Sequence, residues 1–148
     1  MKVKEIMTRK VTSIFPDLNA KEALGLLLKM KISGLPVIDD KNKLAGMFTE
    51  KEVLATILPS YLEKVGRFMY QENPKAVKQK IATFSDMKVK DVMRSEVVTV
   101  DEDTTLCEVA RIMLTQKARR LPVINKEKVV VGIVARGDVV EALFAEYK

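Results

Sequence analysis

The sequence predicts an α/β (α+β) fold made of two similar halves. The chain has 148 residues, and the run Leu-Pro-Val-Ile at 35–38 recurs 86 positions later, at 121–124. At that offset the match extends without a gap over residues 2–58 and 88–144. In both copies, apolar β-branched runs alternate with segments of helical periodicity. An internal repeat of this kind predicts two equivalent halves that bury their apolar faces together.

The limits of the repeat suggest how the chain is divided. We expect a first repeat at residues 1–58, a helical insert or linker at 59–87 and a second repeat at 88–148. A repeat of this size is marginal alone, because a very small domain buries too little surface. Each repeat is expected to fold in the order strand, helix, strand, strand, helix, as a small α/β sandwich.

The first repeat opens with an amphipathic segment, Lys2–Met7, which predicts a brief lead-in helix. Val11–Ile14 is β-prone and predicts a short strand. Asn19, with Glu22 three residues later, has the form of a capping box, so a helix is expected to begin there and to end at Ser33-Gly34. Its broad apolar face is expected to hold Ala20, Ala23, Leu24, Leu27, Leu28 and Met30.

The rest of this repeat predicts two buried strands and a helix. Leu35–Ile38 and Leu44–Phe48 are continuous apolar runs, separated by a polar turn at 39–42. Thr49 and Glu52 form a second capping box, which predicts a helix through about Leu58.

The second repeat predicts the same elements in the same order. Strands are expected at 97–100, 121–124 and 129–134. Thr105 and Glu108 repeat the capping box of the first helix. A last helix is expected from the segment 135–138 to about Tyr147.

Residues 59–87 have no counterpart in the repeat. A structureless linker of that length is unusual in a compact domain, so we expect two helices. The first is predicted at 61–70, and the second is predicted to begin at Asn73-Pro74, with Pro in the first turn. The second helix is expected to align four apolar side chains, those of Ala76, Val77, Ile81 and Phe84.

Charge and composition exclude several classes of protein. The net charge is +6, but basic and acidic residues are interspersed and aromatic residues are few, so no nucleic-acid partner is expected. No apolar run approaches the roughly 20 residues of a membrane helix, and the start of the chain lacks the apolar core of a signal peptide. A single cysteine cannot form an internal disulfide. We expect a cytoplasmic protein without membrane contact.

The residue types also argue against catalysis and metal binding. The chain has no His, which is the commonest general base and metal ligand, and no P-loop or Cys/His metal spacing. Cys107 is interpreted as buried packing and the eight Met residues as core filler. No catalytic residue, metal ligand or required cofactor is therefore predicted.

Three short motifs occur in both copies. They are Glu5–Thr8 with Asp91–Arg94, the Leu-Pro-Val-Ile runs, and the pattern Gly-apolar-apolar-x-x-x-acid at 46–52 and 132–138. Duplicated in order at one offset, these motifs resemble a tandem pair of CBS domains, the cystathionine-β-synthase type repeat, also called a Bateman module. The resemblance covers both repeats. It implies that they pack about a pseudo-twofold axis and leave two clefts.

The resemblance implies a regulatory, ligand-sensing module and no enzymatic activity. Such modules bind an adenine nucleotide or adenosine derivative (AMP, ADP, ATP or S-adenosylmethionine) in the clefts between the repeats. They often form homodimers, and they regulate an enzyme, channel or transporter. The alternative is a structural or interaction module that binds no ligand and acts through dimerisation and the helical insert.

Nucleotide-binding members carry Ser or Thr, followed three residues later by Asp, after the Gly-containing strand. The carboxylate accepts hydrogen bonds from the ribose hydroxyls, and the hydroxyl helps to hold phosphate. The first copy has Thr49 with Glu52, and the second has Ala135 with Asp138. Asp138 is the better ribose candidate and Thr49 the better hydroxyl candidate. Both acids also fit a purely structural role at a helix N-terminus.

Phosphate contacts are expected mainly in the second repeat. Arg119 and Arg120 stand where relatives carry basic residues that meet phosphates, and Arg136 could join them. Their alternative interpretation is a solvated surface pair. The matching positions Ser33 and Gly34 carry no charge, so the two sites are expected to be unequal.

The resemblance also implies where the adenine ring lies. Relatives hold it against the first strand and against the residues that precede and include the Pro. The corresponding residues are Val11, Thr12, Leu35 and Pro36 in one copy, and Val97, Val98, Leu121 and Pro122 in the other.

Overall fold

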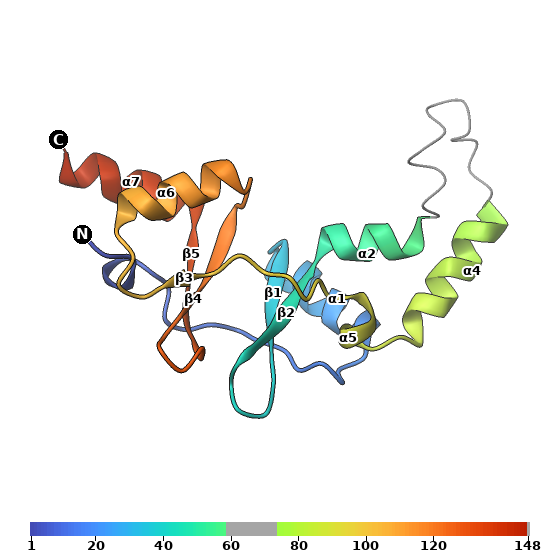
Figure 1. Ribbon diagram of the computed structural model, residues 1–148. Coiled ribbons are helices and arrows are strands. Elements are labelled where there is room, and N and C mark those ends of the chain that lie inside the picture. Colours follow the sequence, from blue (N-terminus) through green and yellow to red (C-terminus); the bar gives the residue numbers. More distant parts are fainter. Residues whose placement is uncertain (59–73, 148) are drawn as a thin grey trace. The chain divides into compact units, whose positions relative to one another are not determined.

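The computed structural model describes residues 1–58 and 74–147 (Figure 1). The chain forms two compact units, which are described separately below. Unit 1 comprises Met1–Thr12, Ile38–Leu44 and Glu96–Lys148, and unit 2 comprises Ser13–Val37 and Ala45–Ser95. Helices and strands are mixed in each unit, which confirms the predicted α/β class.

Unit 2 holds most of the first repeat. Its elements are α1 (Ala20–Met30), β1 (Gly34–Ile38), β2 (Leu44–Thr49), α2 (Glu50–Ile57), α4 (Pro74–Ser85) and α5 (Val89–Val92). β1 and β2 pair as a two-stranded sheet. The strand predicted at 11–14 is wrong, since Ile14 makes only an isolated parallel bridge with Val37. A turn closed by the Leu18 N–H and the Phe15 carbonyl follows at once and leaves no room for a longer strand.

Unit 1 holds most of the second repeat. Its elements are the 3₁₀ turn η1 (Val3–Glu5), β3 (Val100–Asp101), α6 (Leu106–Thr115), β4 (Arg120–Ile124), β5 (Val130–Ala135) and α7 (Arg136–Glu146). β3 runs parallel to β4, and β4 runs antiparallel to β5. The first strand of this repeat is thus shorter and later than the predicted 97–100. α6 packs against α7 (Figure 1).

The predicted N-terminal caps are present. The Asn19 side chain accepts the Glu22 N–H at 3.1 Å, and the Thr105 hydroxyl accepts the Glu108 N–H at 3.4 Å. α1 ends at Met30, before the predicted Ser33-Gly34, because Lys31 adopts the left-handed conformation with φ of 55°. Such a residue directs the chain out of the helix.

The apolar face of α1 is narrower than predicted. Ala20, Ala23 and Leu27 are buried, whereas Leu28 is 61% exposed and Met30 is also exposed. In the second repeat Leu114, the counterpart of Leu28, is exposed as well. One stripe of each helix faces its sheet, so the neighbouring positions remain at the surface.

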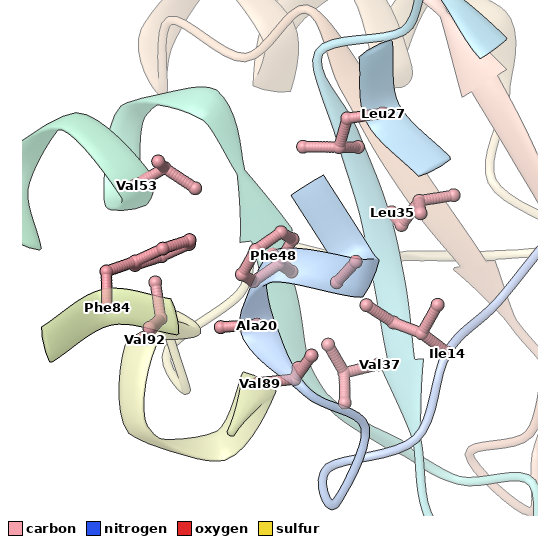
Figure 2. Close-up of a cluster of buried hydrophobic side chains, with 11 residues drawn as sticks. Ile14, Ala20, Leu27, Leu35, Val37, Phe48, Val53, Phe84, Val89 and Val92 are labelled. Atoms are coloured by element: carbon pink, nitrogen blue, oxygen red, sulfur yellow. The ribbon is translucent and has the colours of Figure 1, made fainter. Parts of the chain in front are cut away.

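The core of unit 2 draws on three parts of the chain (Figure 2). It consists of Ile14, Ala20, Ala23, Leu27, Leu35, Val37, Phe48, Val53, Phe84, Val89 and Val92. Phe84 extends from α4 toward Phe48 of β2 (Figure 2). The helix predicted to begin at Asn73-Pro74 is therefore confirmed as α4, although Ile81 is exposed rather than aligned with Phe84. The helix predicted at 61–70 lies outside the described residues.

The leading segment of each repeat packs into the unit that contains the other repeat. Val3 and Met7 belong to the core of unit 1, and Val89 belongs to the core of unit 2. The Val3 N–H donates to the Thr104 carbonyl at 2.8 Å, and the Val89 N–H makes the equivalent bond in unit 2, also at 2.8 Å. The compact units therefore differ from the ranges 1–58, 59–87 and 88–148, which follow the repeat in the sequence.

Equivalent ion pairs hold these leading segments. Lys4 contacts Asp103 at 2.9 Å in unit 1, and Lys90 contacts Asp17 at 3.1 Å in unit 2. The hydrogen bond and charge of Lys90 lower the pKa of Asp17, and those of Lys4 lower the pKa of Asp103. In each unit, an equivalent ion pair therefore holds the leading segment of one repeat against the residues of the other repeat.

Candidate functional site

Two equivalent candidate sites lie where the Gly-containing strand of each repeat meets the following helix. The Thr49 site, in unit 2, consists of Ser33, Gly34, Thr49, Glu52 and Arg94. The Asp138 site, in unit 1, consists of Thr8, Arg119, Arg120, Ala135, Arg136 and Asp138. One backbone hydrogen bond fixes each, from Glu50 to the Ser33 carbonyl and from Arg136 to the Arg119 carbonyl, both at 2.9 Å.

In the Thr49 site both carboxylate oxygens of Glu52 already face protein groups. The Thr49 hydroxyl donates to Oε2 of Glu52 and accepts the Glu52 N–H at 3.4 Å. Oε1 of Glu52 lies 3.7 Å from Nη1 of Arg94. The Glu52 side chain is only 14% exposed. The predicted capping interpretation of Thr49 is confirmed here.

In the Asp138 site the carboxylate is less occupied. Oδ2 of Asp138 accepts the N–H of Ala135 at 3.1 Å, across the start of α7. Ala135 has no hydroxyl, and no ion pair among the described residues involves Asp138. Asp138 thus forms one half of a capping box, and its second oxygen has no hydrogen-bond donor among the described residues.

Three arginines lie at or next to the end of the β4–β5 strand pair. Arg120 is the first residue of β4 and pairs with Ala135, the last residue of β5. Arg119 and Arg136 are joined through their backbones. All three are exposed, and none takes part in an ion pair within the part of the chain that the structure describes. Their role in holding phosphate stays a prediction.

A packing constraint accounts for Gly34 at the position where the Asp138 site has Arg120. A β-carbon on Gly34 would lie 2.8 Å from Cγ2 of Thr49, which is too close. At the equivalent place in unit 1, the partner is Ala135, which has no γ-carbon, and Arg120 is accommodated. Gly34 beside Thr49 and Arg120 beside Ala135 are thus two residue combinations that fit the same packing position.

The sequence reasoning missed the residues that the leading segments contribute. Arg94 forms an antiparallel bridge with Met47, through two backbone bonds of 2.9 Å, and Thr8 pairs in the same way with Ile133. A signal was available in Gly46 and Gly132. A β-carbon on Gly46 would lie 2.6 Å from the Arg94 carbonyl, and Gly within a strand often marks such a close approach.

The two sets of residues predicted to contact adenine are distributed differently over the compact units. Leu35 and Pro36 are buried in β1, and Leu121 and Pro122 are buried in β4. In the second set, Val97 and Val98 belong to unit 1 together with β4. In the first set, Val11 and Thr12 belong to unit 1 and the β1 residues to unit 2. Contact of either set with adenine stays a prediction.

The other reactive or metal-binding residue types in the described part of the chain form no further site. Cys107 is exposed, so its predicted burial is wrong; on α6 its neighbours Leu106 and Val109 take the buried positions. Within residues 1–58 and 74–147, no group of three acidic, Cys or His side chains is arranged to hold a metal ion. No described helix has the length and apolar character needed to cross a membrane.

A hollow of about 470 Å³ lies along α4, lined by Lys75, Ala76, Lys78, Gln79 and Ala82. Its lining, as far as it falls on described residues, includes none of the predicted ligand-binding residues and no carboxylate. We therefore assign it no part in the candidate sites.

The CBS domain family matches the chain twice, at residues 3–59 and 89–145. The chain belongs to the CBS-domain family. The two CBS matches cover both candidate sites and leave out the segment between residues 59 and 89. The tandem CBS pair inferred from the duplicated motifs is thereby confirmed.

Individual CBS proteins show the same similarity over nearly the whole chain. Uncharacterized protein MJ1426 of Methanocaldococcus jannaschii is 32% identical over 97% of this chain and 91% of its own length. CBS domain-containing protein CBSX1 of Arabidopsis thaliana, described as chloroplastic, is 34% identical over 95% of this chain. The chain spans only 63% of the length of CBSX1.

A solved CBS structure shares the fold. The crystal structure of CBSX2 in complex with AMP has a TM-score of 0.76 and 29% identity, and the similarity covers 99% of this chain and 98% of that one. The CBS-pair architecture of this chain is therefore that of a known ligand-binding protein.

Proposed function

We propose that the protein is a regulatory module that binds an adenine nucleotide or adenosine derivative at the Asp138 site. The observation that carries the proposal is the Asp138 carboxylate, which lies at the start of α7 and has one oxygen without a donor among residues 1–58 and 74–147. Binding would alter the activity of an enzyme or transporter. The ligand acts as a regulator and not as a cofactor.

The chemistry of the site suits a nucleotide. A carboxylate accepts hydrogen bonds from the two hydroxyls of a ribose, and Asp138 retains lone pairs for that purpose. Arg119, Arg120 and Arg136 provide forked donors that match phosphate oxygens, and none of them is engaged in an ion pair with a described residue. The N-terminus of α7 adds a favourable partial positive charge.

The comparison with CBSX2 supports the same ligand class. Its structure was solved in complex with AMP, and it shares 29% identity with this chain over nearly its whole length. AMP is therefore the first ligand to test, followed by ADP, ATP and S-adenosylmethionine.

The test is a thermal-shift and calorimetric titration of the purified full chain with each ligand. A ligand that binds only the folded state, supplied at about 100 times its Kd, should raise Tm by roughly 5–10 °C. Asp138→Asn should weaken binding roughly 10- to 100-fold, because the charged acceptor is lost while an oxygen remains to accept the Ala135 N–H.

The matched control is Glu141→Ala, which removes an exposed acid from the same helix, three residues further on. It should leave both Tm and affinity unchanged. No Tm shift with any of the four ligands at millimolar concentration would contradict the proposal. Equal affinity of Asp138→Asn and the wild type would remove Asp138 from the site.

A second candidate function is favoured by exposed apolar side chains on the helices of unit 1. Leu114 of α6 is 77% exposed and Phe144 of α7 is 76% exposed, although these helices pack against each other. We propose that this face joins two copies of the chain in a homodimer. Light scattering during size-exclusion chromatography should give twice the chain mass, and the mass of a single chain would contradict the dimer.

A further inference from the structure

Arg94 and Thr8 occupy equivalent positions in the leading segments of the two repeats but differ in charge. In unit 2 the segment after α5 pairs Arg94 with Met47, and in unit 1 the segment after η1 pairs Thr8 with Ile133. The backbone bonds are alike, at 2.9 Å in the first case and at 2.8 and 3.0 Å in the second. Only the side chains differ.

The Arg94 guanidinium faces the acid that a ribose would need. Nη1 of Arg94 lies 3.7 Å from Oε1 of Glu52, while Oε2 of Glu52 accepts the Thr49 hydroxyl. We propose that Arg94 keeps the Thr49 site closed to ribose, so that each chain binds a single adenine ligand, at the Asp138 site. This inference rests on the proposed function, since it assigns which of the two sites is open.

The electrostatics favour the closed state. Nη1 of Arg94 forms an ion pair with Glu52 at 3.7 Å, which is too long for a hydrogen bond, whereas a ribose would bring only neutral hydroxyl donors. The Glu52 side chain is 14% exposed and the Arg94 side chain is 46% exposed, so solvent screens this pair in part. A ligand must therefore break an internal pair before it can hydrogen-bond to Glu52.

The Asp138 site has no such obstacle. Thr8 at the equivalent position carries no charge, and no ion pair of a described residue reaches Asp138. The Thr49 site, in turn, has Ser33 and Gly34 where unit 1 has Arg119 and Arg120. The two sites therefore differ both next to the acid and at the positions predicted to meet phosphate.

The decisive variant replaces Arg94 with the residue of the other repeat, Arg94→Thr. Its fold should be retained, because the bridge to Met47 uses only backbone atoms and Thr8 makes the same bridge in unit 1. In calorimetric titrations with AMP, the wild type should bind one AMP per chain and Arg94→Thr should bind two. A change in Tm of the unliganded variant would report any loss of folding separately.

The double variant Arg94→Thr/Asp138→Asn isolates the Thr49 site. Asp138→Asn alone should bind AMP at least about tenfold more weakly than the wild type, and the double variant should recover binding at one AMP per chain. The charge-matched control is Arg111→Thr on α6, which removes an arginine paired with Glu108 and should leave the stoichiometry at one.

Each other outcome overturns the inference. Two AMP per wild-type chain would show that the Thr49 site is already open. A single AMP per chain in Arg94→Thr, or failure of the double variant to recover binding, would show that Arg94 does not close it. Weaker binding in Arg94→Thr would make Arg94 a ligand contact. Absence of AMP binding to every variant would instead contradict the proposed function itself.

Discussion

The Thr49 site and the Asp138 site share one backbone and differ in their side chains. The bonds that tie strand, helix and leading segment together recur at equivalent residues, for example Glu50 to Ser33 and Arg136 to Arg119, both at 2.9 Å. The side chains around these bonds differ between the two sites, and neighbouring side chains differ together. Thr49 goes with Gly34, and Ala135 goes with Arg120.

The two repeats share the backbone hydrogen bonds of the site, and each has its own combination of side chains around them. In unit 2, a hydroxyl, a longer acid and a guanidinium satisfy one another. In unit 1, the acid and the arginines have no ion-pair partner among the described residues, so they remain available to a ligand. A site whose polar groups are already paired binds less readily, because each internal interaction must first be replaced.

The largest expected difference between the two sites is in the free energy of unfolding after substitution of the strand glycines, Gly46 and Gly132. Gly46→Ala should destabilise the protein by about 1–3 kcal/mol, because the new β-carbon would lie 2.6 Å from the Arg94 carbonyl, which belongs to the backbone. Gly132→Ala should cost less, because the backbone atom it meets, the Thr8 carbonyl, is further away at 3.0 Å, and the nearest atom is Sδ of the Met7 side chain at 2.5 Å. Urea denaturation gives the free energy of unfolding for both variants.

Helical glycines serve as matched controls for these substitutions. At Gly25 in α1 and Gly137 in α7, an added β-carbon would meet no heavy atom within 4 Å. Gly25→Ala should therefore raise the free energy of unfolding by up to about 1 kcal/mol, through helix propensity alone. If Gly46→Ala and Gly25→Ala had equal effects, the close approach of the leading segment would not constrain the sequence.

Replacing residues of the Thr49 site with those of the Asp138 site should have an intermediate effect on the free energy of unfolding. Gly34→Arg alone should be destabilising, because its β-carbon would lie 2.8 Å from Cγ2 of Thr49. Adding Thr49→Ala should relieve that clash, so the two changes together should cost less than their sum by about 1 kcal/mol. A double-mutant cycle in urea denaturation measures this coupling. Strict additivity would show that the two positions vary independently.

The sequence predicted the parts of the fold that local chemistry determines. Asn19 and Thr105 were identified as N-caps because a polar side chain followed by Glu three residues later satisfies a helix start regardless of tertiary context. The buried strands at Leu35 and Leu121 followed from continuous apolar runs. The duplicated motifs also predicted the tandem CBS pair.

The remaining features depend on contacts between distant parts of the chain. The strand predicted at 11–14 is absent because only Ile14 finds a partner, and propensity alone cannot show this. Arg94 was missed because it follows Glu52 by more than 40 residues and reaches it only through the exchanged leading segment. Leu28 was placed on the buried face because periodicity locates an apolar stripe but not its width.

The smallest expected effect concerns the ion pairs of the leading segments. Lys90 lowers the pKa of Asp17 and Lys4 lowers that of Asp103, and both carboxylates are exposed. A carboxyl whose pKa is lower in the folded state stabilises the protein above its unfolded pKa, which is about 4, and that stabilisation disappears as the pH falls through the folded pKa. Tm should therefore drop below about pH 4, and Asp17→Asn and Asp103→Asn should each reduce that drop slightly. Because the two pairs are equivalent, the reductions should be similar, and screening by 1 M salt should diminish both. A clear difference between the two variants would mean that one leading segment is held more firmly than the other, which would extend the asymmetry of the sites to the scaffold itself.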